Sequence, residues 1–248
     1  MPNMLDAVLL CGGAGLRLRS IIGDTPKGMA NIGGRPFLEL LIRQLYRHGF
    51  ERAILAIGYG GDAIRSYFGN QAFGLQLAYS VEPRPLGTGG ALRNATDAVG
   101  SESVLIMNGD SYTDADLGEL VANYHKVRTD ASIVVVPADS RGDCGSVQLD
   151  ENGKLAAFAE KYGPFHAPYV NAGIYVLSRE ILYEIPPKVE LSLERELLPE
   201  WLRRGKCIKA FISSAKCIDI GTPERYWEAQ DILTKVEVDA NVPQSGSQ

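Results

Sequence analysis

The sequence lacks three features that would each indicate a particular class of protein. It has no apolar run approaching the ~20 residues that a membrane helix needs, so we expect no membrane association. It has no basic surplus, because its formal net charge is -5, and nucleic acid is therefore not an expected partner. No basic segment followed by a cleavable apolar stretch stands at the start, so no signal peptide is expected.

Cysteine and histidine are also scarce. The four cysteines form no C-x-x-C pair, and none of the three histidines stands at zinc-finger spacing. We therefore expect reduced thiols and a cytoplasmic protein. The hydrophobic share of 45% and the charged share of 22% are typical of a globular protein.

The length of 248 residues suits one α/β domain with a large core better than two full domains. From residue 237 the chain contains Asn, Pro, Gln, Ser and Gly without periodicity. We expect a single domain over residues 1–235, followed by a disordered tail over residues 236–248.

Short apolar runs alternate with segments of helical spacing over the first half of the chain. The expected strands are 4–10, 52–57, 76–80, 103–107 and 131–136. The expected helices are 37–47, 62–68 with Asp62 as N-cap, 90–95 and 116–127. This alternation predicts a parallel sheet covered by helices.

The pattern changes in the second half. Segments 145–149 and 154–160 flank the turn Asp150-Glu151-Asn152-Gly153, which predicts a hairpin. A further strand is expected over 172–177, and helices over 193–203 and 224–234, the last with Thr222 as N-cap and Pro223 at its first position. The sheet is therefore expected to be mixed.

A glycine-rich loop after the first strand is the strongest local signal. Leu10-Cys11-Gly12-Gly13-Ala14-Gly15-Leu16-Arg17 is followed by Pro26-Lys27. Glycines let backbone N–H groups approach phosphate oxygens, and Arg17 and Lys27 can neutralise a polyphosphate from two sides. A tight strand-to-helix turn with solvated basic residues is the alternative interpretation.

Two other phosphate-binding motifs fit this loop less well. The dinucleotide fingerprint fails because Leu18 stands where its third Gly belongs, which argues against a dinucleotide-dependent dehydrogenase. The Walker A motif fails because Gly28 follows Lys27 instead of preceding it.

Two aspartates follow apolar segments. Asp110 ends a strand, where it can hold Mg²⁺ with a phosphate oxygen, although Gly-Asp also ends many strands as a plain turn. Asp219 stands between two isoleucines, where a carboxylate is costly unless it is paired or binds a metal. Between these two aspartates, Lys161 can hold a phosphate, and Glu160 and Asn171 can bond sugar hydroxyls, although each of the three taken alone is more often an ordinary surface residue.

Together these motifs resemble the sugar-nucleotide pyrophosphorylase family of sugar-1-phosphate nucleotidyltransferases. Within that family the chain is similar to bacterial D-glycero-α-D-manno-heptose 1-phosphate guanylyltransferases. The matching residues stand in the family's order and are Gly12-Gly13-Ala14-Gly15-Leu16-Arg17-Leu18, Pro26-Lys27, Leu86-Gly87-Thr88-Gly89-Gly90, Gly109-Asp110, Glu160-Lys161, Asn171-Ala172-Gly173 and Asp219-Ile220-Gly221-Thr222-Pro223. Leu16 departs from the family, which often has Ser or Thr there.

The resemblance implies a Rossmann-like, three-layer α/β nucleotidyltransferase fold (GT-A-like) with a mostly parallel, mixed central sheet. It also implies Mg²⁺ as cofactor, GTP and a sugar 1-phosphate as substrates, and leaves a homodimer open. The implied catalytic residues are Arg17, Lys27, Asp110, Lys161 and Asp219, with Asp110 and Asp219 as metal ligands. The implied nucleotide-binding residues are Leu10, Gly12, Gly13, Gly15, Glu82, Pro85, Gly87, Thr88, Asn108 and Gly109. The implied sugar-binding residues are Gly145, Glu160 and Asn171.

The base and the sugar are separate predictions. Glu82 stands where related uridylyl- and thymidylyltransferases often carry Gln, and an ionised carboxylate can accept from both N1–H and N2–H of guanine, so GTP is expected. The alternative is that Glu82 is a solvated loop residue and that backbone groups read the base. The segment 161–171 offers Tyr162, His166 or Tyr169 for the extra hydroxyl of a heptose, or is a packed aromatic loop. Mannose 1-phosphate with GTP, an amino sugar with UTP, and a non-catalytic nucleotide-sugar sensor are the alternatives.

Overall fold

The computed structural model describes residues 5–127, 129–138, 145–159 and 167–235. Over these residues ten strands form one sheet, along the path β11-β10-β12-β7-β1-β4-β6-β5, with β9 paired to β12 and β13 paired to β9. The strands are β1 (Asp6–Leu10), β4 (Arg52–Ile57), β5 (Gln71–Ala72), β6 (Leu75–Val81), β7 (Ser103–Asn108), β9 (Ala131–Pro137), β10 (Ser146–Leu149), β11 (Leu155–Ala159), β12 (Tyr169–Ser178) and β13 (Ile208–Ile212).

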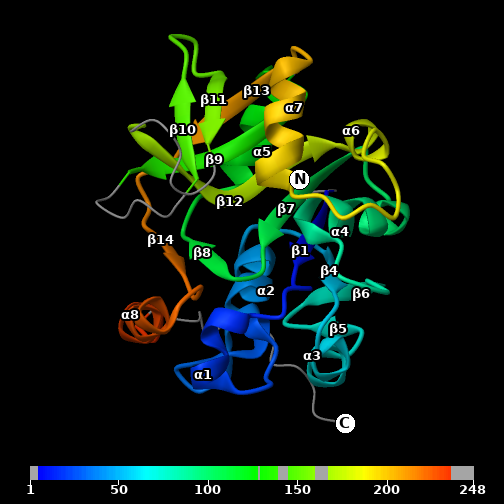
Figure 1. Cartoon of the computed structure of the whole chain (residues 1–248), viewed down its shortest axis with the longest axis vertical. Coiled ribbons are helices and arrows are strands. Elements are labelled where there is room, and N and C mark those ends of the chain that lie inside the picture. The colour runs from blue at the N-terminus through cyan, green and yellow to red at the C-terminus, as the bar shows by residue number, and fades with distance from the viewer. Residues whose placement is uncertain (1–4, 128, 139–144, 160–166, 236–248) are drawn as a thin grey trace.

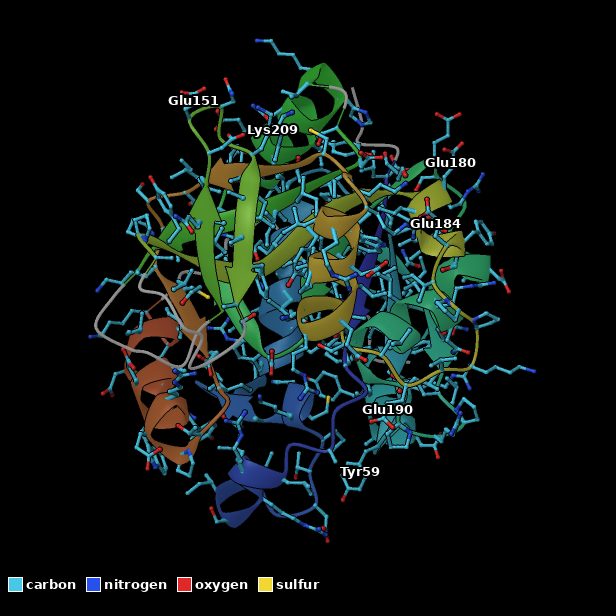
Figure 2. The ribbon with its side chains drawn as sticks, turned by 45° about the horizontal axis from the view of Figure 1, so that its top comes forward. Tyr59, Glu151, Glu180, Glu184, Glu190 and Lys209 are labelled. Carbon is cyan, nitrogen blue, oxygen red and sulfur yellow. The ribbon has the colours of Figure 1, made fainter. Side chains whose placement is uncertain are left out.

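The sheet is mostly parallel at its centre and mixed beyond it, as expected. β1 pairs in parallel with β4 and β7, and β4 pairs in parallel with β6. β12 runs antiparallel to both β7 and β9, and β10 and β11 form the predicted antiparallel hairpin. Lys209 of β13 supports the hairpin turn by donating from Nζ to the Asn152 carbonyl at 2.6 Å, and Figure 2 shows Lys209 close to Glu151 of that turn.

Two apolar cores, one on each face of the sheet, make the molecule three-layered. Alternate residues of β1 point to opposite faces, so Ala7 and Leu9 belong to one core and Val8 to the other. The helices α2 (Phe37–Arg47), α3 (Gly61–Phe68), α5 (Leu117–Val127) and α8 (Pro223–Leu233) contribute to the first core. The helices α4 (Gly87–Ala95), α6 (Arg179–Tyr183) and α7 (Leu198–Arg203) contribute to the second (Figure 1).

Two predicted helix starts are wrong. The helix expected from Asp62 begins at Gly61, and its N-cap is Gly60 in the left-handed conformation, so Asp62 lies in the first turn. The helix expected from Gly90 begins at Gly87, so the Gly-rich segment there is a helical turn and not a loop. By contrast, Thr222 caps α8 as predicted, because its side chain accepts a hydrogen bond from the Arg225 N–H.

Short elements complete the fold, and most were not predicted. These are η1 (Leu16–Leu18), α1 (Arg19–Ile22), η2 (Lys27–Met29), β2 (Asn31–Ile32), β3 (Arg35–Pro36), η3 (Thr96–Ala98), β8 (Ser111–Thr113), η4 (Leu193–Leu197) and β14 (Cys217–Asp219). β14 and β8 form a separate two-stranded sheet, and β14 leads to α8 at the lower left of the molecule in Figure 1. No helix in the described part of the chain is long and apolar enough to cross a membrane.

Candidate active site

The glycine-rich loop and the Asp110 turn meet because two parallel strands end side by side. Leu10 at the end of β1 pairs in register with Asn108 at the end of β7. The Gly109 N–H then donates to the Leu10 carbonyl at 3.0 Å. The two segments that follow these strands therefore lie at the carboxyl edge of the sheet, where ligands of open α/β sheets bind.

Asp219 reaches the same place through the small β8–β14 sheet. In that antiparallel pair Asp219 stands opposite Ser111, the neighbour of Asp110. The Ile220 N–H donates to the Asp110 carbonyl at 3.0 Å. The pairing therefore brings together the two carboxylates that the sequence predicts as metal ligands.

A cavity of about 640 Å³ opens over these residues. Its lining contains predicted catalytic, nucleotide-binding and sugar-binding residues together with others that were not predicted. The lining residues are Arg17, Lys27, Asn108, Asp110, Ser111, Gly145, Phe158, Asn171, Ala172, Gly173, Ser192, Glu194, Arg195, Cys217, Asp219, Gly221 and Arg225. The cavity is large enough for a small organic ligand. Among the described residues, four basic and three acidic side chains line the cavity and give that part of its lining a formal charge of +1, on a chain whose formal net charge is -5.

Lys27 and Arg17 converge on one point of the cavity. Lys27 Nζ forms an ion pair with Asp110 Oδ2 at 2.6 Å, and the Lys27 side chain is 14% exposed. A Cβ placed on Gly221 would lie 3.8 Å from both Lys27 Nζ and Arg17 Nη2. Gly15 packs against the Lys27 side chain. The predicted phosphate-binding cations are thus close together, beside both predicted metal ligands.

Asp219 has an ion-pair partner in the fold, one of the two explanations that the sequence left open for a carboxylate at this position. Its position between two isoleucines left metal binding or an unidentified partner as explanations. Asp219 Oδ2 accepts from Arg225 Nη1 at 2.5 Å, and Asp219 Oδ1 accepts from the Gly221 N–H at 2.8 Å. Arg225, which lies in the first turn of α8, therefore gives Asp219 a structural partner that the sequence analysis missed.

A smaller hollow of about 160 Å³ adjoins the cavity on the side of the glycine-rich loop. Its lining is Leu10, Cys11, Gly13, Lys27, Gly28, Thr88, Asn108, Gly109 and Asp110. Five of the predicted nucleotide-binding residues therefore share one wall. Burial raises the pKa of the Cys11 thiol, which stays neutral and is not a candidate nucleophile.

Glu82 closes over the glycine-rich loop. A Cβ on Gly12 would lie 2.3 Å from Glu82 Oε1, so a larger residue there would displace the end of the Glu82 side chain. Glu82 Oε2 accepts from the Leu86 N–H at 3.1 Å. Burial raises the pKa of Glu82, and the Leu86 hydrogen bond lowers it in part. The structure thus joins Glu82 to both glycine-containing segments.

The Gly87–Gly90 turn has a structural role that the sequence analysis did not foresee. Gly87, with φ 69°, packs so closely on the Leu191 carbonyl that a Cβ would lie 2.5 Å from it. The Gly89 N–H donates to the same carbonyl at 2.8 Å. Of the residues predicted here to bind the nucleotide, Thr88 lines the smaller hollow, whereas Pro85 and Gly87 line neither hollow, because this turn binds the segment before η4.

On the sugar side, a distortion of β12 presents Asn171. The register of β12 against β9 shifts between Asn171 and Tyr175, and Asn171 Oδ1 accepts from the Gly173 N–H at 2.9 Å. The Asn171 N–H donates to the Gly145 carbonyl at 2.9 Å. The two described members of the predicted sugar site are therefore directly bonded.

Three polar residues at the start of η4 also face the cavity and were not predicted. Ser192, Glu194 and Arg195 all line it. Glu194 accepts from Thr88 Oγ1 at 2.6 Å and from the Tyr175 hydroxyl at 3.2 Å. These contacts join distant parts of the chain, so no local sequence signal marks them.

Some predictions fall elsewhere. Glu160, Lys161, Tyr162 and His166 lie outside the described residues. Tyr169 packs against one of the two apolar cores and does not line the cavity, which favours the packed-loop interpretation for this residue.

The described residues contain no group of three or more His, Cys, Asp or Glu side chains able to hold a metal ion. Asp110 and Asp219 both line the cavity, and carboxylate oxygens are a donor type that suits Mg²⁺. An ion there would need its other ligands from water or phosphate oxygens, which is the usual arrangement for Mg²⁺ with a nucleotide.

The sequence matches the family described as Nucleotidyl transferase over residues 6–236. The D-glycero-alpha-D-manno-heptose 1-phosphate guanylyltransferase of Campylobacter jejuni is 36% identical, over 90% of this chain and 97% of that protein. The mannose-1-phosphate guanylyltransferase of Mycobacterium tuberculosis is 35% identical over 90% of this chain, but the chain spans only 63% of its length.

This chain also resembles solved structures in both fold and sequence. HddC from Yersinia pseudotuberculosis has a TM-score of 0.81 and 34% sequence identity, over 92% of this chain and 99% of HddC. It has also been crystallised in complex with GMP-PN. With a family match across nearly all the described residues and relatives of this similarity, the chain belongs to the nucleotidyl transferase family and is a nucleotidyltransferase.

Proposed function

We propose that this enzyme transfers the guanylyl group of GTP to D-glycero-α-D-manno-heptose 1-phosphate, releasing pyrophosphate and forming GDP-heptose. The observation that carries the proposal is the single cavity that unites Arg17, Lys27 and Asp110 with Gly145 and Asn171. Its nucleotide side and its sugar side are contiguous, as direct transfer between two bound substrates requires. The similarity to the Campylobacter jejuni enzyme over 97% of that enzyme's length supports this choice of substrates.

The reaction is an in-line attack by a sugar-phosphate oxygen on the α-phosphorus of GTP. The new P–O bond joins the guanylyl group to the sugar phosphate, and the bond between the α-phosphorus and the bridging oxygen breaks as pyrophosphate leaves. The attacking oxygen is already anionic at neutral pH, so no general base is needed. The main barrier is repulsion between two anions, which preorganised cations reduce.

Arg17 and Lys27 supply those cations in the proposal. Both approach the same point beside Gly221, so they can hold neighbouring phosphate oxygens of the triphosphate and of the leaving pyrophosphate. Lys27 is less exposed than its partner Asp110, 14% against 43% for the side chains, and its position is therefore the more constrained. Lys161, outside the described residues, remains the proposed partner of the sugar phosphate.

Mg²⁺ is the proposed cofactor, and Asp110 and Asp219 are the residues that would hold it. When bound, the ion would neutralise phosphate charge and stabilise the charge that develops in the transition state. The chain's own contribution is to hold both carboxylates beside the cavity, where Asp110 forms an ion pair with Lys27 and Asp219 forms one with Arg225.

Glu82 is the proposed reader of the base. It lies against Gly12 of the glycine-rich loop, although neither residue lines the cavity or the smaller hollow, and an ionised carboxylate only accepts hydrogen bonds. Guanine presents adjacent N1–H and N2–H donors, which one carboxylate can bind together. This chemistry supports GTP over UTP.

The sugar would lie against Gly145 and Asn171, with Glu160 as a further proposed partner. Asn171 carries an amide that can both donate and accept, and Glu194 adds a carboxylate to the same cavity. A site that bonds the hydroxyl of the extra CH(OH) group discriminates strongly against mannose, because its absence leaves a buried polar group unpaired. Mannose 1-phosphate is the second candidate, favoured by the Mycobacterium tuberculosis relative.

The test is pyrophosphate release from each of GTP, UTP, dTTP, ATP and CTP, combined in turn with heptose, mannose and glucosamine 1-phosphates. The proposal expects release with GTP and the heptose phosphate above every other pair. Release with UTP and an amino-sugar phosphate would replace the proposed substrates, and binding of nucleotide sugar without release from any pair would indicate a sensor.

A further inference from the structure

The fold places a permanent cation, the Arg225 guanidinium, beside Asp219. Arg225 is buried, with 8% of its surface exposed, and its Nη1 donates to Asp219 Oδ2 at 2.5 Å. Pro223 begins α8, and Thr222 Oγ1 accepts from the Arg225 N–H at 3.4 Å, so the helix cap fixes the backbone from which this side chain extends. The guanidinium stays charged at any working pH. Asp219 is therefore neutralised whether or not a ligand is present.

Basic side chains also outnumber acidic ones in the described lining of the cavity, by four to three. A free divalent cation entering this site meets a lining of net positive charge and two carboxylates that are already paired. A divalent cation bound to a nucleoside triphosphate is instead part of a complex that is still anionic. The same lining attracts that complex.

We propose that Arg225 is a positioning residue whose charge, acting through Asp219, makes the site select the metal–triphosphate complex over the free cation. The inference rests on the metal site of the proposed function, but not on the identity of the base or the sugar. Arg225 shares Asp219 with the metal without contacting the reacting atoms. Removing its charge should leave an ionised carboxylate that binds a free divalent cation more tightly.

The experiment measures Mn²⁺ binding from the electron paramagnetic resonance signal of free Mn²⁺, without nucleotide. Arg225→Gln keeps a hydrogen-bond donor for Asp219 and removes the charge, whereas Arg225→Lys keeps the charge. Arg203→Met removes an exposed charge from α7 and is the control. Loss of one like charge near the ion should tighten Mn²⁺ binding by about tenfold or more in Arg225→Gln, while Arg225→Lys and Arg203→Met match the wild type.

Two further measurements complete the test. In the presence of a GTP analogue with a methylene between the α- and β-phosphorus, the Mn²⁺ affinities of Arg225→Gln and wild type should differ less. The triphosphate then supplies much of the attraction for Mn²⁺. Adding Asp219→Asn to Arg225→Gln should abolish the gain. Equal or weaker Mn²⁺ binding by folded Arg225→Gln, or a gain that survives Asp219→Asn, would overturn the inference.

Circular dichroism melting establishes that each variant is folded, and Arg225→Met provides a second charge-removing variant if Arg225→Gln does not fold. Mn²⁺ binding needs no turnover, so the outcome is independent of the substrate panel. A gain in Mn²⁺ affinity without pyrophosphate release would leave this inference standing while the proposed function failed. Pyrophosphate release without a gain in Mn²⁺ affinity would leave the proposed function standing and overturn this inference.

Discussion

Replacing Lys27 by Met should lower kcat by about 10²–10³-fold while changing the KM for GTP much less. The Lys27 ammonium lies in the cavity 2.6 Å from Asp110 and beside Arg17. At contact distance, about 4 Å between charges, one such interaction amounts to ~4 kcal/mol at an effective dielectric constant of ~20, or about 10³ in rate. Because the cavity is open to solvent, part of this interaction energy is screened, and the expected loss of kcat therefore extends down to about 10²-fold.

The assay is steady-state pyrophosphate release with varied GTP at a saturating concentration of sugar phosphate. Met keeps most of the apolar stem of Lys27, so packing changes little. Lys206→Met is a matched control, because Lys206 Nζ also forms a partly buried ion pair, with Glu184 Oε1 at 2.7 Å. Figure 2 shows Glu184 on the opposite side of the molecule from α8. If Lys27→Met raised KM and left kcat unchanged, Lys27 would be a ground-state contact, and its role in the transition state would be refuted.

Three other predictions concern the base, the metal and the core. Glu82→Gln should lower the GTP:UTP ratio of kcat/KM. Since burial raises the pKa of Glu82, the wild-type ratio should also fall as pH drops through that raised value, while the ratio of the variant stays level; an unchanged ratio in Glu82→Gln would mean that backbone groups read the base. Asp110→Asn and Asp219→Asn should each lose most of kcat while remaining folded by circular dichroism, and EDTA should abolish wild-type activity until Mg²⁺ is restored; full activity in either variant would exclude it as a required ligand. Trp201→Ala should destabilise the protein by about 3–5 kcal/mol in urea unfolding, because this side chain is 1% exposed in the second core; a loss below ~1 kcal/mol would contradict its packing role.

Much of the fold was predictable because it depends on local pattern. Buried parallel strands such as β1 and β7 are continuous apolar runs, and the end of α2 before Gly49 is marked in the sequence. The helix cap at Thr222 is equally local. Short elements such as β8 and β14 were missed, because three-residue strands carry almost no periodic signal.

The candidate site likewise contains residues that the sequence predicts and residues that it does not. Arg17, Lys27, Asp110 and Asp219 stand in recognisable motifs, and the fold brings all four to one cavity. Arg225 was missed because it is also an ordinary first-turn residue of α8, and only the β14–α8 turn aims it at Asp219.

The same limit applies to pairs that are far apart in the chain. The contact between Thr88 and Glu194 depends on the packing of η4 against α4. No spacing rule reveals such a pair. Glu160 and Lys161 remain predictions that rest on the family resemblance.

Competition between two sugar phosphates for one nucleotide tests whether this enzyme is a heptose 1-phosphate guanylyltransferase. GTP labelled at the α-phosphorus is mixed with equal, limiting concentrations of D-glycero-α-D-manno-heptose 1-phosphate and α-mannose 1-phosphate, and the labelled products are separated. Label is expected mainly in GDP-heptose, in proportion to a much higher kcat/KM for the heptose phosphate. Equal label in GDP-mannose, or more, would contradict the heptose assignment, and label in neither product would contradict guanylyl transfer to these sugars.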